Sequence, residues 1–252
     1  MTRIILHGCC GQMGRMIAQL AMKEDDLEIV AGVDSREGEG LLFPFYKSVS
    51  DVKEDADVVI DFSVSDATDA LLEACVAKQL PVVLCTTGLS DAQLAHMKEA
   101  SNRIAVLKSA NMSLGVNLLL KVIGDITPVL RQAGFDIEIV EQHHRRKVDA
   151  PSGTALALAD AARDAVKETA LSYTFDRSDR RQQRDPDEIG ISAVRGGTIV
   201  GEHDVIFAGE DEVITLKHSA HSRAVFAKGA LAAARFLNGK AAGFYGMEDV
   251  IG

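Results

Sequence analysis

The sequence predicts an α/β protein in which a doubly wound parallel sheet is joined to an α+β domain with an open mixed sheet. Over roughly the first hundred residues, short apolar runs alternate with segments whose apolar residues recur at helical spacing. Such alternation is typical of parallel strands connected by right-handed helical crossovers. After Leu107 the pattern changes to long helical segments, followed by strands in which apolar and polar residues alternate, which indicates the second domain.

Strands of the first half are expected at short runs rich in Val, Ile and Leu, namely residues 3–7, 27–33, 58–62, 81–84 and 103–107. Helices are expected between them, at residues 12–22, 67–77 and 91–100. Ser65 and Ser90 stand just before two of these helices, where we expect their side chains to act as N-caps.

The second half is expected to open with a long helix over residues 114–130. Phe135, Ile137 and Ile139 then alternate with polar residues and predict a half-buried strand. A further helix with one apolar stripe follows over residues 155–166.

Residues 172–188 are polar and carry both charges, so we expect a long surface loop, with a flexible linker as the alternative. Strand-like runs at residues 189–194, 198–208 and 212–218 are joined by glycine-rich turns and predict a sheet that is mainly antiparallel. The last helix, over residues 224–237, is expected to return and pack on the first half.

Composition limits the function classes. The chain has 252 residues, 47% of them hydrophobic and 25% charged, as expected for a globular enzyme with a substantial core. A formal net charge of −10 argues against nucleic acid as a partner, and no apolar run approaches the roughly 20 residues that span a bilayer. The four cysteines show no paired zinc spacing, so we interpret them as reduced thiols of a cytoplasmic protein without a metal site.

A glycine-rich loop follows the first expected strand and opens the first expected helix. Gly8, Gly11 and Gly14 would allow a tight turn, close approach of a pyrophosphate and close packing of helix on strand. The spacing is GxxGxxG, because Cys10 stands where a glycine is usual. Asp34 ends the second strand 20 residues after Gly14, where a carboxylate accepts hydrogen bonds from ribose hydroxyls. This arrangement predicts a Rossmann-type dinucleotide site, the alternative being a tight turn alone.

Cofactor preference is left open by the residues after the second strand. Asp34 favours a free 2′-hydroxyl and therefore NADH, whereas Ser35 and Arg36 could hold the 2′-phosphate of NADPH. Two further polar segments, residues 86–88 and 109–113, follow expected strands at the edge where parallel sheets bind ligands. We expect them to contact the nicotinamide carboxamide and ribose, with turns held by local hydrogen bonds as the alternative.

Residues 141–155, EQHHRRKVDAPSGTA, form the most informative segment of the chain. Two imidazoles and three cations between His143 and Lys147 are followed by Pro151 and Ser152, which mark the start of a helix. The N–H groups of a helix start bind anions, so the segment suits a small substrate with two carboxylates. An imidazole is well matched to proton transfer near neutral pH. A solvated basic edge or localisation signal is the alternative.

With these motifs taken together, the sequence closely resembles the dihydrodipicolinate reductase family over essentially its full length. The resemblance rests on segments 8–15, 86–88, 109–117, 141–155, 194–203 and 219–223. The pattern His-His-x-x-Lys-x-Asp-Ala-Pro-Ser-Gly-Thr at residues 143–154 is specific to the family, whereas the glycine loop is not.

The resemblance implies a dinucleotide-binding domain over residues 1–113 with 224–252, and a substrate-binding and oligomerisation domain over residues 114–223. It implies a homotetramer formed through the substrate-domain sheets. It further implies NADH- or NADPH-dependent reduction of 4-hydroxy-tetrahydrodipicolinate, a cyclic dicarboxylate, to tetrahydrodipicolinate on the route to diaminopimelate and lysine.

Roles carried over by position make His143 the general acid and Lys147 the second proton donor, with His144, Gly153 and Thr154 contacting substrate carboxylates. We expect Lys147 to donate because the like charges of Arg145 and Arg146 disfavour its charged form. The expected cofactor contacts are Gly8, Gly11, Gln12, Met13, Gly14, Asp34, Ser35, Thr86, Thr87, Gly88, Ser109, Asn111 and Met112. Cys9, Cys10, Gln12 and Cys85 depart from residues more typical of the family, which bears on cofactor affinity and preference.

Other functions are less well supported by the residues. A semialdehyde dehydrogenase would need a nucleophilic cysteine in the catalytic half, yet all four cysteines precede residue 86. A nucleotide sensor without turnover would have no use for His143 and Lys147 beside an anion-binding helix start. His218 and His221 have the spacing of a ligand pair, but no third ligand is visible at suitable spacing.

Overall fold

The fold is described from a computed structural model over residues 1–38, 40–167, 169–178 and 180–252. Two compact units divide the chain. Unit 1 comprises Met1–Leu114 and Ala224–Gly252, and unit 2 comprises Gly115–Arg223. Within the described ranges, none of the helices is long and apolar enough to cross a membrane.

Unit 1 is built on a parallel sheet in the strand order β12-β6-β5-β4-β1-β2-β3. Its strands are β1 (Thr2–His7), β2 (Leu27–Val33), β3 (Phe45–Tyr46), β4 (Val58–Asp61), β5 (Val82–Leu84), β6 (Ala105–Lys108) and β12 (Gly243–Tyr245). Its helices are α1 (Gln12–Ala21), α2 (Thr68–Lys78), α3 (Asp91–Ala100), α6 (Ala224–Leu237) and α7 (Met247–Ile251), with short 3₁₀ turns at Val49–Asp51 and Ser65–Ala67. The expected doubly wound sheet is therefore confirmed.

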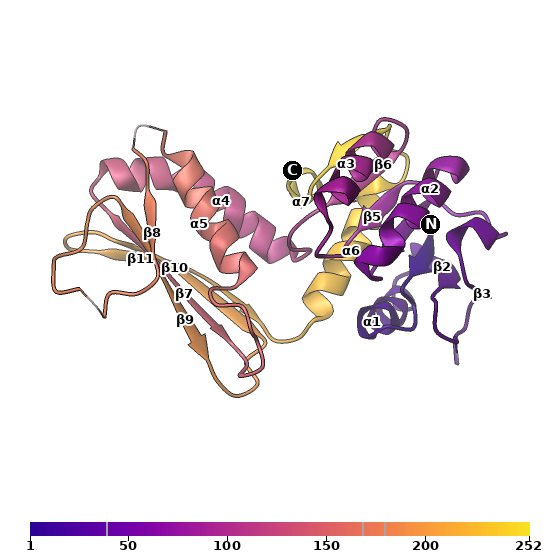
Figure 1. The fold of residues 1–252 in the computed structure, drawn as a ribbon, viewed down its shortest axis with the longest axis horizontal. Helices are drawn as coiled ribbons and strands as arrows, with labels where there is room; N and C mark the ends of the chain where they lie inside the picture. Colours follow the sequence, from indigo (N-terminus) through magenta and orange to yellow (C-terminus); the bar gives the residue numbers. More distant parts are fainter. Residues whose placement is uncertain (39, 168, 179) are drawn as a thin grey trace. The chain divides into compact units, whose positions relative to one another are not determined.

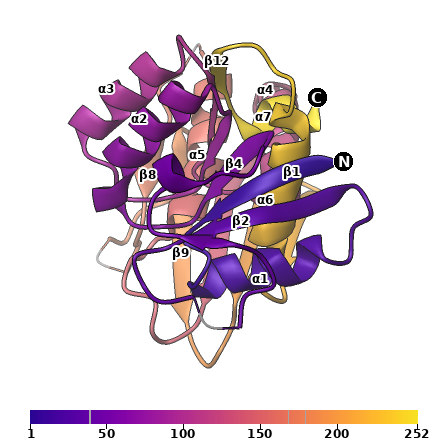
Figure 2. The same cartoon turned by 90° about the vertical axis from the view of Figure 1, so that its right-hand side faces the viewer.

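Helices cover both faces of this sheet, as Figure 2 shows. One apolar core joins α1 and α6 to one face, and α2 and α3 close a second core on the other face. The strands between them are almost fully apolar because both of their faces are buried. The last helix thus packs on the first half of the chain, as expected.

Of the two predicted helix N-caps, only one is found in the structure. Ser90 caps α3, as predicted, and also forms a capping box with Gln93. The prediction for Ser65 is wrong: this residue begins the 3₁₀ turn, and α2 starts after Ala67 without a side-chain cap. The 3₁₀ turn tightens the chain just before the helix and moves the helix start past the serine.

Unit 2 packs two helices on one face of a five-stranded sheet (Figure 1). The helices are α4 (Leu114–Gln132) and α5 (Gly153–Ala165), and the strands are β7 (Asp136–His143), β8 (Ser172–Thr174), β9 (Glu188–Arg195), β10 (Gly201–Ala208) and β11 (Val213–Ala220). The strand order is β11-β10-β7-β9-β8. Pairs β10–β11 and β10–β7 are antiparallel, whereas β7–β9 and β8–β9 are parallel. The sheet is therefore mixed, and not mainly antiparallel, because α5 carries the chain across the sheet between β7 and its neighbours.

The segment 172–188 is neither a plain surface loop nor a linker; its Asp179 lies outside the described residues. It begins with β8, and three arginines that follow pair with carboxylates on β7 and β9. Arg177 and Arg180 bind the carboxylate of Glu188, and Arg184 binds Glu138. Burial works against ionisation of Glu188, but these hydrogen bonds dominate and hold its pKa at about 2. Charge pairing with β7 and β9, which composition does not reveal, holds these arginines against the sheet.

Candidate active site

The glycine loop of unit 1 has the close contacts that dinucleotide binding requires. Gly8 follows β1 with φ of +80°, and a Cβ there would lie 2.5 Å from the carbonyl oxygen of Phe62. A Cβ on Gly14 would lie 2.3 Å from the carbonyl oxygen of Gly8, so α1 can approach β1 only with glycine at this position. Gly11 is the N-cap of α1 and contributes no side-chain cap, while Gln12 and Met13 begin the helix. The loop therefore presents a helix N-terminus suited to a pyrophosphate.

Asp34 lies directly after β2 and is tied to the glycine loop. Its Oδ2 accepts a hydrogen bond of 2.9 Å from the backbone N–H of Cys10, and its Oδ1 accepts one of 3.0 Å from the N–H of Arg36. Burial opposes ionisation, but hydrogen bonds from Arg36 and Cys10 outweigh it and lower the pKa of Asp34. The backbone carbonyls of Ser35 and Arg36 both accept hydrogen bonds from Lys47, a residue that the sequence interpretation missed.

The segments after β5 and β6 are joined by a partly buried lysine. Lys108, at the end of β6, donates through Nζ to the carbonyl oxygen of Thr86 at 2.8 Å. Burial lowers the pKa of Lys108. Thr87 and Gly88 continue from Thr86, with Gly88 at φ +73°. The signal for Lys108 was available, because it is a cation that ends an apolar run.

Ser109, Asn111 and Met112 follow β6 in a turn held by local hydrogen bonds. The Ser109 hydroxyl donates to the carbonyl oxygen of Asn111 at 2.9 Å, and the Asn111 side-chain oxygen accepts from the N–H of Ser113 at 2.8 Å. The Met112 side chain is buried in the core and not presented to a ligand. Of the three, Met112 is therefore the one whose side chain is not positioned to contact a cofactor.

Asp61 organises the same edge of the sheet and was missed from the sequence. The carboxylate is fully buried at the end of β4. It accepts hydrogen bonds from the Thr86 hydroxyl at 2.5 Å and from the N–H of Ser63 at 3.1 Å, and it lies 2.8 Å from Nδ1 of His7. The ends of β1, β4 and β5 are thereby linked. An aspartate inside an apolar strand was the available signal.

In unit 2, one buried carboxylate joins the basic strand end to the helix start. Glu141 and His143 lie on the same face of β7, and Oε2 of Glu141 is 2.6 Å from Nδ1 of His143. Oε1 of Glu141 accepts from the N–H of Ser152 at 2.9 Å. Arg195 on β9 donates to both carboxylate oxygens, at 2.7 and 2.6 Å. The glutamate thus holds His143 and the start of α5 together.

The start of α5 has the geometry expected of an anion site. Ser152 is the N-cap, and its hydroxyl accepts a hydrogen bond of 3.2 Å from the N–H of Ala155. The same hydroxyl lies 3.0 Å from Nε2 of His203 on β10. Gly153 and Thr154 are the first residues of the helix, and the space where Gly153 would carry a side chain is open.

The charges of this site are set by burial and by hydrogen bonds. Burial opposes ionisation of Glu141, but hydrogen bonds from Arg195, His143 and Ser152 outweigh it and lower the pKa of Glu141. For His203, burial and the nearby His143 lower the pKa to about 4, so its ring is neutral at pH 7. The Ser152 hydroxyl can then donate to Nε2 of His203 while it accepts from the helix.

The remaining residues of the basic segment differ in their surroundings. Arg145 and Arg146 are exposed, as the solvated-edge alternative describes. Lys147 is partly buried and pairs with Asp149 at 2.8 Å, so its nearest charge is a carboxylate and not the two arginines. The hydrogen bond from Lys147 lowers the pKa of Asp149. His144 is partly buried, and its Nδ1 makes no hydrogen bond to a described residue.

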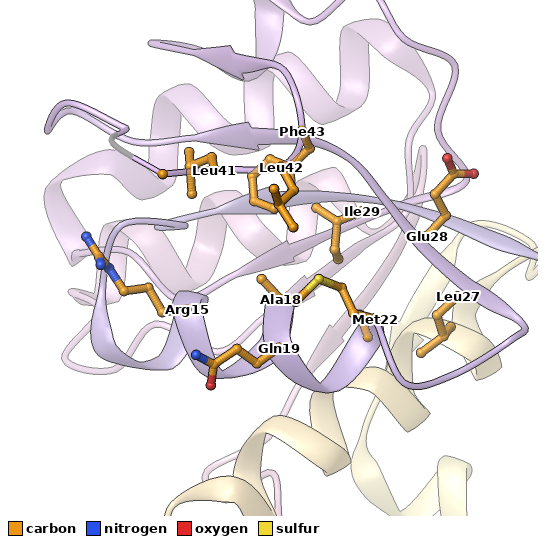
Figure 3. A pocket seen from close by; sticks show the side chains of 12 residues that line it. Arg15, Ala18, Gln19, Met22, Leu27, Glu28, Ile29, Leu41, Leu42 and Phe43 are labelled. Atoms are coloured by element: carbon orange, nitrogen blue, oxygen red, sulfur yellow. The ribbon is translucent and has the colours of Figure 1, made fainter.

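A cavity of about 450 Å³ lies elsewhere in unit 1, between α1, β2 and the chain after residue 40 (Figure 3). Leu27, Ile29, Leu42 and Phe43 give it an apolar lining, with Arg15 at one end. None of the sequence-predicted site residues lines it. We assign it no role in cofactor or substrate binding.

Both halves of the chain match domains of a known protein family. Residues 2–112 match the N-terminal domain of dihydrodipicolinate reductase, and residues 115–251 match its C-terminal domain. A 4-hydroxy-tetrahydrodipicolinate reductase of Caldanaerobacter subterraneus subsp. tengcongensis is 53% identical over 251 residues, which are 100% of this chain and 98% of that protein. The reductase of Clostridium novyi is 49% identical, with the same coverage.

A solved structure shares the fold. A dipicolinate-bound dihydrodipicolinate reductase from Paenisporosarcina sp. TG-14 superposes with a TM-score of 0.81 at 23% identity, covering 99% of each chain. The match of both domains and the high identity along the whole chain confirm the resemblance noted in the sequence. The chain belongs to the dihydrodipicolinate reductase family.

Proposed function

We propose that this protein reduces 4-hydroxy-tetrahydrodipicolinate to tetrahydrodipicolinate with NADH or NADPH, on the route to diaminopimelate and lysine. Full-length relatives that carry the name of this reductase support the proposal. The observation that carries it is the buried Glu141, which joins His143 to the N-terminus of α5. A proton donor beside an anion-binding helix start is what reduction of a cyclic dicarboxylate requires.

Unit 1 binds the dinucleotide. The N–H groups of the glycine loop and of the start of α1 hold the pyrophosphate, and Asp34 accepts hydrogen bonds from the ribose. The glycine positions fit this group, because a side chain at Gly8 or Gly14 would collide with backbone atoms. Thr86, Thr87, Gly88, Ser109 and Asn111 contact the nicotinamide end. The nicotinamide supplies the hydride when bound.

Unit 2 binds the substrate and donates protons. The N–H groups at Gly153 and Thr154 bind one carboxylate, and His144 helps to hold the dicarboxylate. His143 donates the proton that follows hydride addition, and Lys147 supplies a second. Glu141 fixes the ring of His143, and Arg195 balances the negative charge of Glu141 within the buried site.

Asp34 and Arg36 would provide for either cofactor. In the free protein, the Arg36 side chain pairs with Asp34 at 3.3 Å. Asp34 would accept hydrogen bonds from the ribose hydroxyls of NADH, and the Arg36 guanidinium would hold the 2′-phosphate of NADPH. Arg36→Ala should therefore raise the KM for NADPH by at least about tenfold, while the KM for NADH changes little. An equal rise for both cofactors would contradict this role.

The protein assembles as a homotetramer through the outer face of the unit 2 sheet and works in the cytoplasm. Strand alternation places Val140, Val194, Ile206 and Val213 on the face opposite the helices. Val194 and Val213 are exposed, so this face has apolar surface to bury. Sedimentation equilibrium tests the assembly, and Ile206→Asp should dissociate it. The four cysteines are free thiols, which suits a reducing compartment.

The decisive assay follows loss of reduced-nicotinamide absorbance with substrate freshly made by a dihydrodipicolinate synthase. Rapid oxidation that depends on the substrate is expected with both NADH and NADPH. His143→Gln should lower kcat by about 10²- to 10⁴-fold without weakening cofactor binding. Arg146→Gln, a change at an exposed neighbour, is the matched control and should retain kcat. Tight cofactor binding without turnover in the wild-type protein would overturn the proposal.

A further inference from the structure

Two cysteines of the glycine loop and the aspartate that follows β2 form a compact group. The Sγ atoms of Cys9 and Cys10 are 3.8 Å apart. Each of Cys9, Cys10 and Asp34 offers one ligand atom, and these atoms lie within 4.8 Å of one another. Among the residues that the structure describes, this is the one group of three such side chains close enough to share an ion. All three side chains are buried, so the group is not a chance surface cluster.

The separation of the two sulfur atoms matches metal coordination. Zn²⁺ binds thiolate sulfur at about 2.3 Å in tetrahedral geometry, which places two sulfur ligands about 3.8 Å apart. A carboxylate oxygen binds the same ion at about 2.0–2.2 Å, so Asp34 needs to close toward the sulfurs by at most about 1 Å. Thiolate ligands select thiophilic ions such as Zn²⁺ and Cd²⁺ over Mg²⁺ or Ca²⁺.

The Cys10 thiol donates a hydrogen bond to the carbonyl oxygen of Glu37 at 3.5 Å. Burial and the adjacent Cys10 raise the pKa of Cys9 to about 12. Binding of a divalent ion forms two metal–sulfur bonds and releases two thiol protons to solvent, with no change of oxidation state. The two thiolates and the carboxylate then face one divalent charge, which removes most of the repulsion among them.

The site overlaps the cofactor site at Asp34. This carboxylate accepts the N–H of Cys10 in the free protein and is the expected acceptor for the ribose hydroxyls. We propose that Cys9, Cys10 and Asp34 bind a thiophilic divalent cation, and that this cation competes with the dinucleotide. The proposal rests on the assignment of the dinucleotide to unit 1 and not on the identity of the substrate.

The test measures metal and cofactor binding directly on the full-length protein without cofactor. Equilibrium dialysis should find one Zn²⁺ per chain, and Cd²⁺ should produce the ultraviolet charge-transfer absorption of thiolate ligation. In Cys10→Ser the metal affinity should fall by at least about tenfold, since the loss of even an outer-shell partner typically costs this much. Cys85→Ser is the matched control, because Cys85 lies in the same unit with the same 8% exposure and outside the group.

Competition is read from NADH fluorescence. The apparent Kd for NADH should rise in proportion to free Zn²⁺ in the wild-type protein and in Cys85→Ser, and far less in Cys10→Ser. Absence of stoichiometric Zn²⁺ binding, or equal affinity in Cys10→Ser, overturns the site. Simultaneous binding of Zn²⁺ and NADH overturns the competition. Reductase turnover measured in chelator is independent of all three outcomes, so failure here is distinguishable from failure of the proposed function.

Discussion

Oε2 of Glu141 lies 2.6 Å from Nδ1 of His143 inside unit 2, and Arg195 donates hydrogen bonds to both oxygens of the same carboxylate. The carboxylate is fully buried, so its charge is tolerated only because these partners surround it. An acceptor at Nδ1 fixes the orientation of the imidazole and leaves Nε2 as the atom that can exchange a proton with substrate. The positioning of His143 therefore depends on Glu141 as much as on the strand that carries it.

Replacing Glu141 by Gln should lower kcat by about 100-fold while the KM for NADH stays unchanged, because His143 loses its ionic partner and unit 1 is untouched. Arg195 would keep its charge without a carboxylate, so the free energy of unfolding should fall by about 3 kcal/mol. Steady-state kinetics and urea unfolding measure the two effects. Glu138→Gln is the matched control, since Glu138 also pairs with arginines but lies on the other face of β7. Equal kcat in both variants would remove Glu141 from the positioning of His143.

His203 predicts acid sensitivity of unit 2. Its pKa is about 4 in the folded protein, below the ordinary value of 6.5, because its ring is buried beside His143. Between these pH values the unfolded chain binds more protons, so stability falls as pH drops from 6.5 to 4. The contribution is about 3 kcal/mol over this window. In His203→Gln, unfolding followed by circular dichroism should depend less on pH, whereas the exposed His221→Gln should behave as wild type.

Lys108 predicts a response of the same sign at higher pH, because its pKa is also lowered in the folded protein. Burial lowers its pKa, so its charge is unfavourable in the folded state at pH 7. Lys108→Met should therefore raise the melting temperature at pH 7. The difference from wild type should shrink as pH rises toward 10.5, since the folded wild type loses its proton before the unfolded chain does. Lys78→Met is the control for burial. Lys78 also donates to one backbone carbonyl, but its side chain is exposed. Equal effects in both variants would show that burial is not the cause.

Two helical glycines predict opposite outcomes of the same substitution. A Cβ on Gly229 in α6 would lie 1.6 Å from the carbonyl oxygen of Met112, a backbone atom that cannot move alone. Gly229→Ala should lower the free energy of unfolding by about 1–3 kcal/mol and weaken NADH binding through the segment after β6. Gly124 in α4 has open space around it, so Gly124→Ala should stabilise by about 0.5–1 kcal/mol. Thermal unfolding of the two variants gives the comparison.

Elements with strong local patterns were predictable. The strands around the glycine loop, helix α6 and the capping box at Ser90 follow from apolar spacing and local hydrogen bonding. The short strands β3, β8 and β12 were missed because each has only two or three residues. Such a strand forms only because a distant strand supplies its hydrogen bonds, and no pattern of its own reveals it.

The candidate site divides in the same way. His143, Lys147 and the start of α5 lie in one continuous segment, so residue type and helix-capping chemistry were sufficient to find them. Glu141 lies in that segment too, but its role depends on Arg195, which is 54 residues away and reaches it through the parallel pairing of β7 with β9. The link of Asp61 to Thr86 likewise requires β4 and β5 to pair. A site whose residues lie in one stretch of chain can be predicted from the sequence. A buried charge, in contrast, acquires its partner only when folding brings separate strands together.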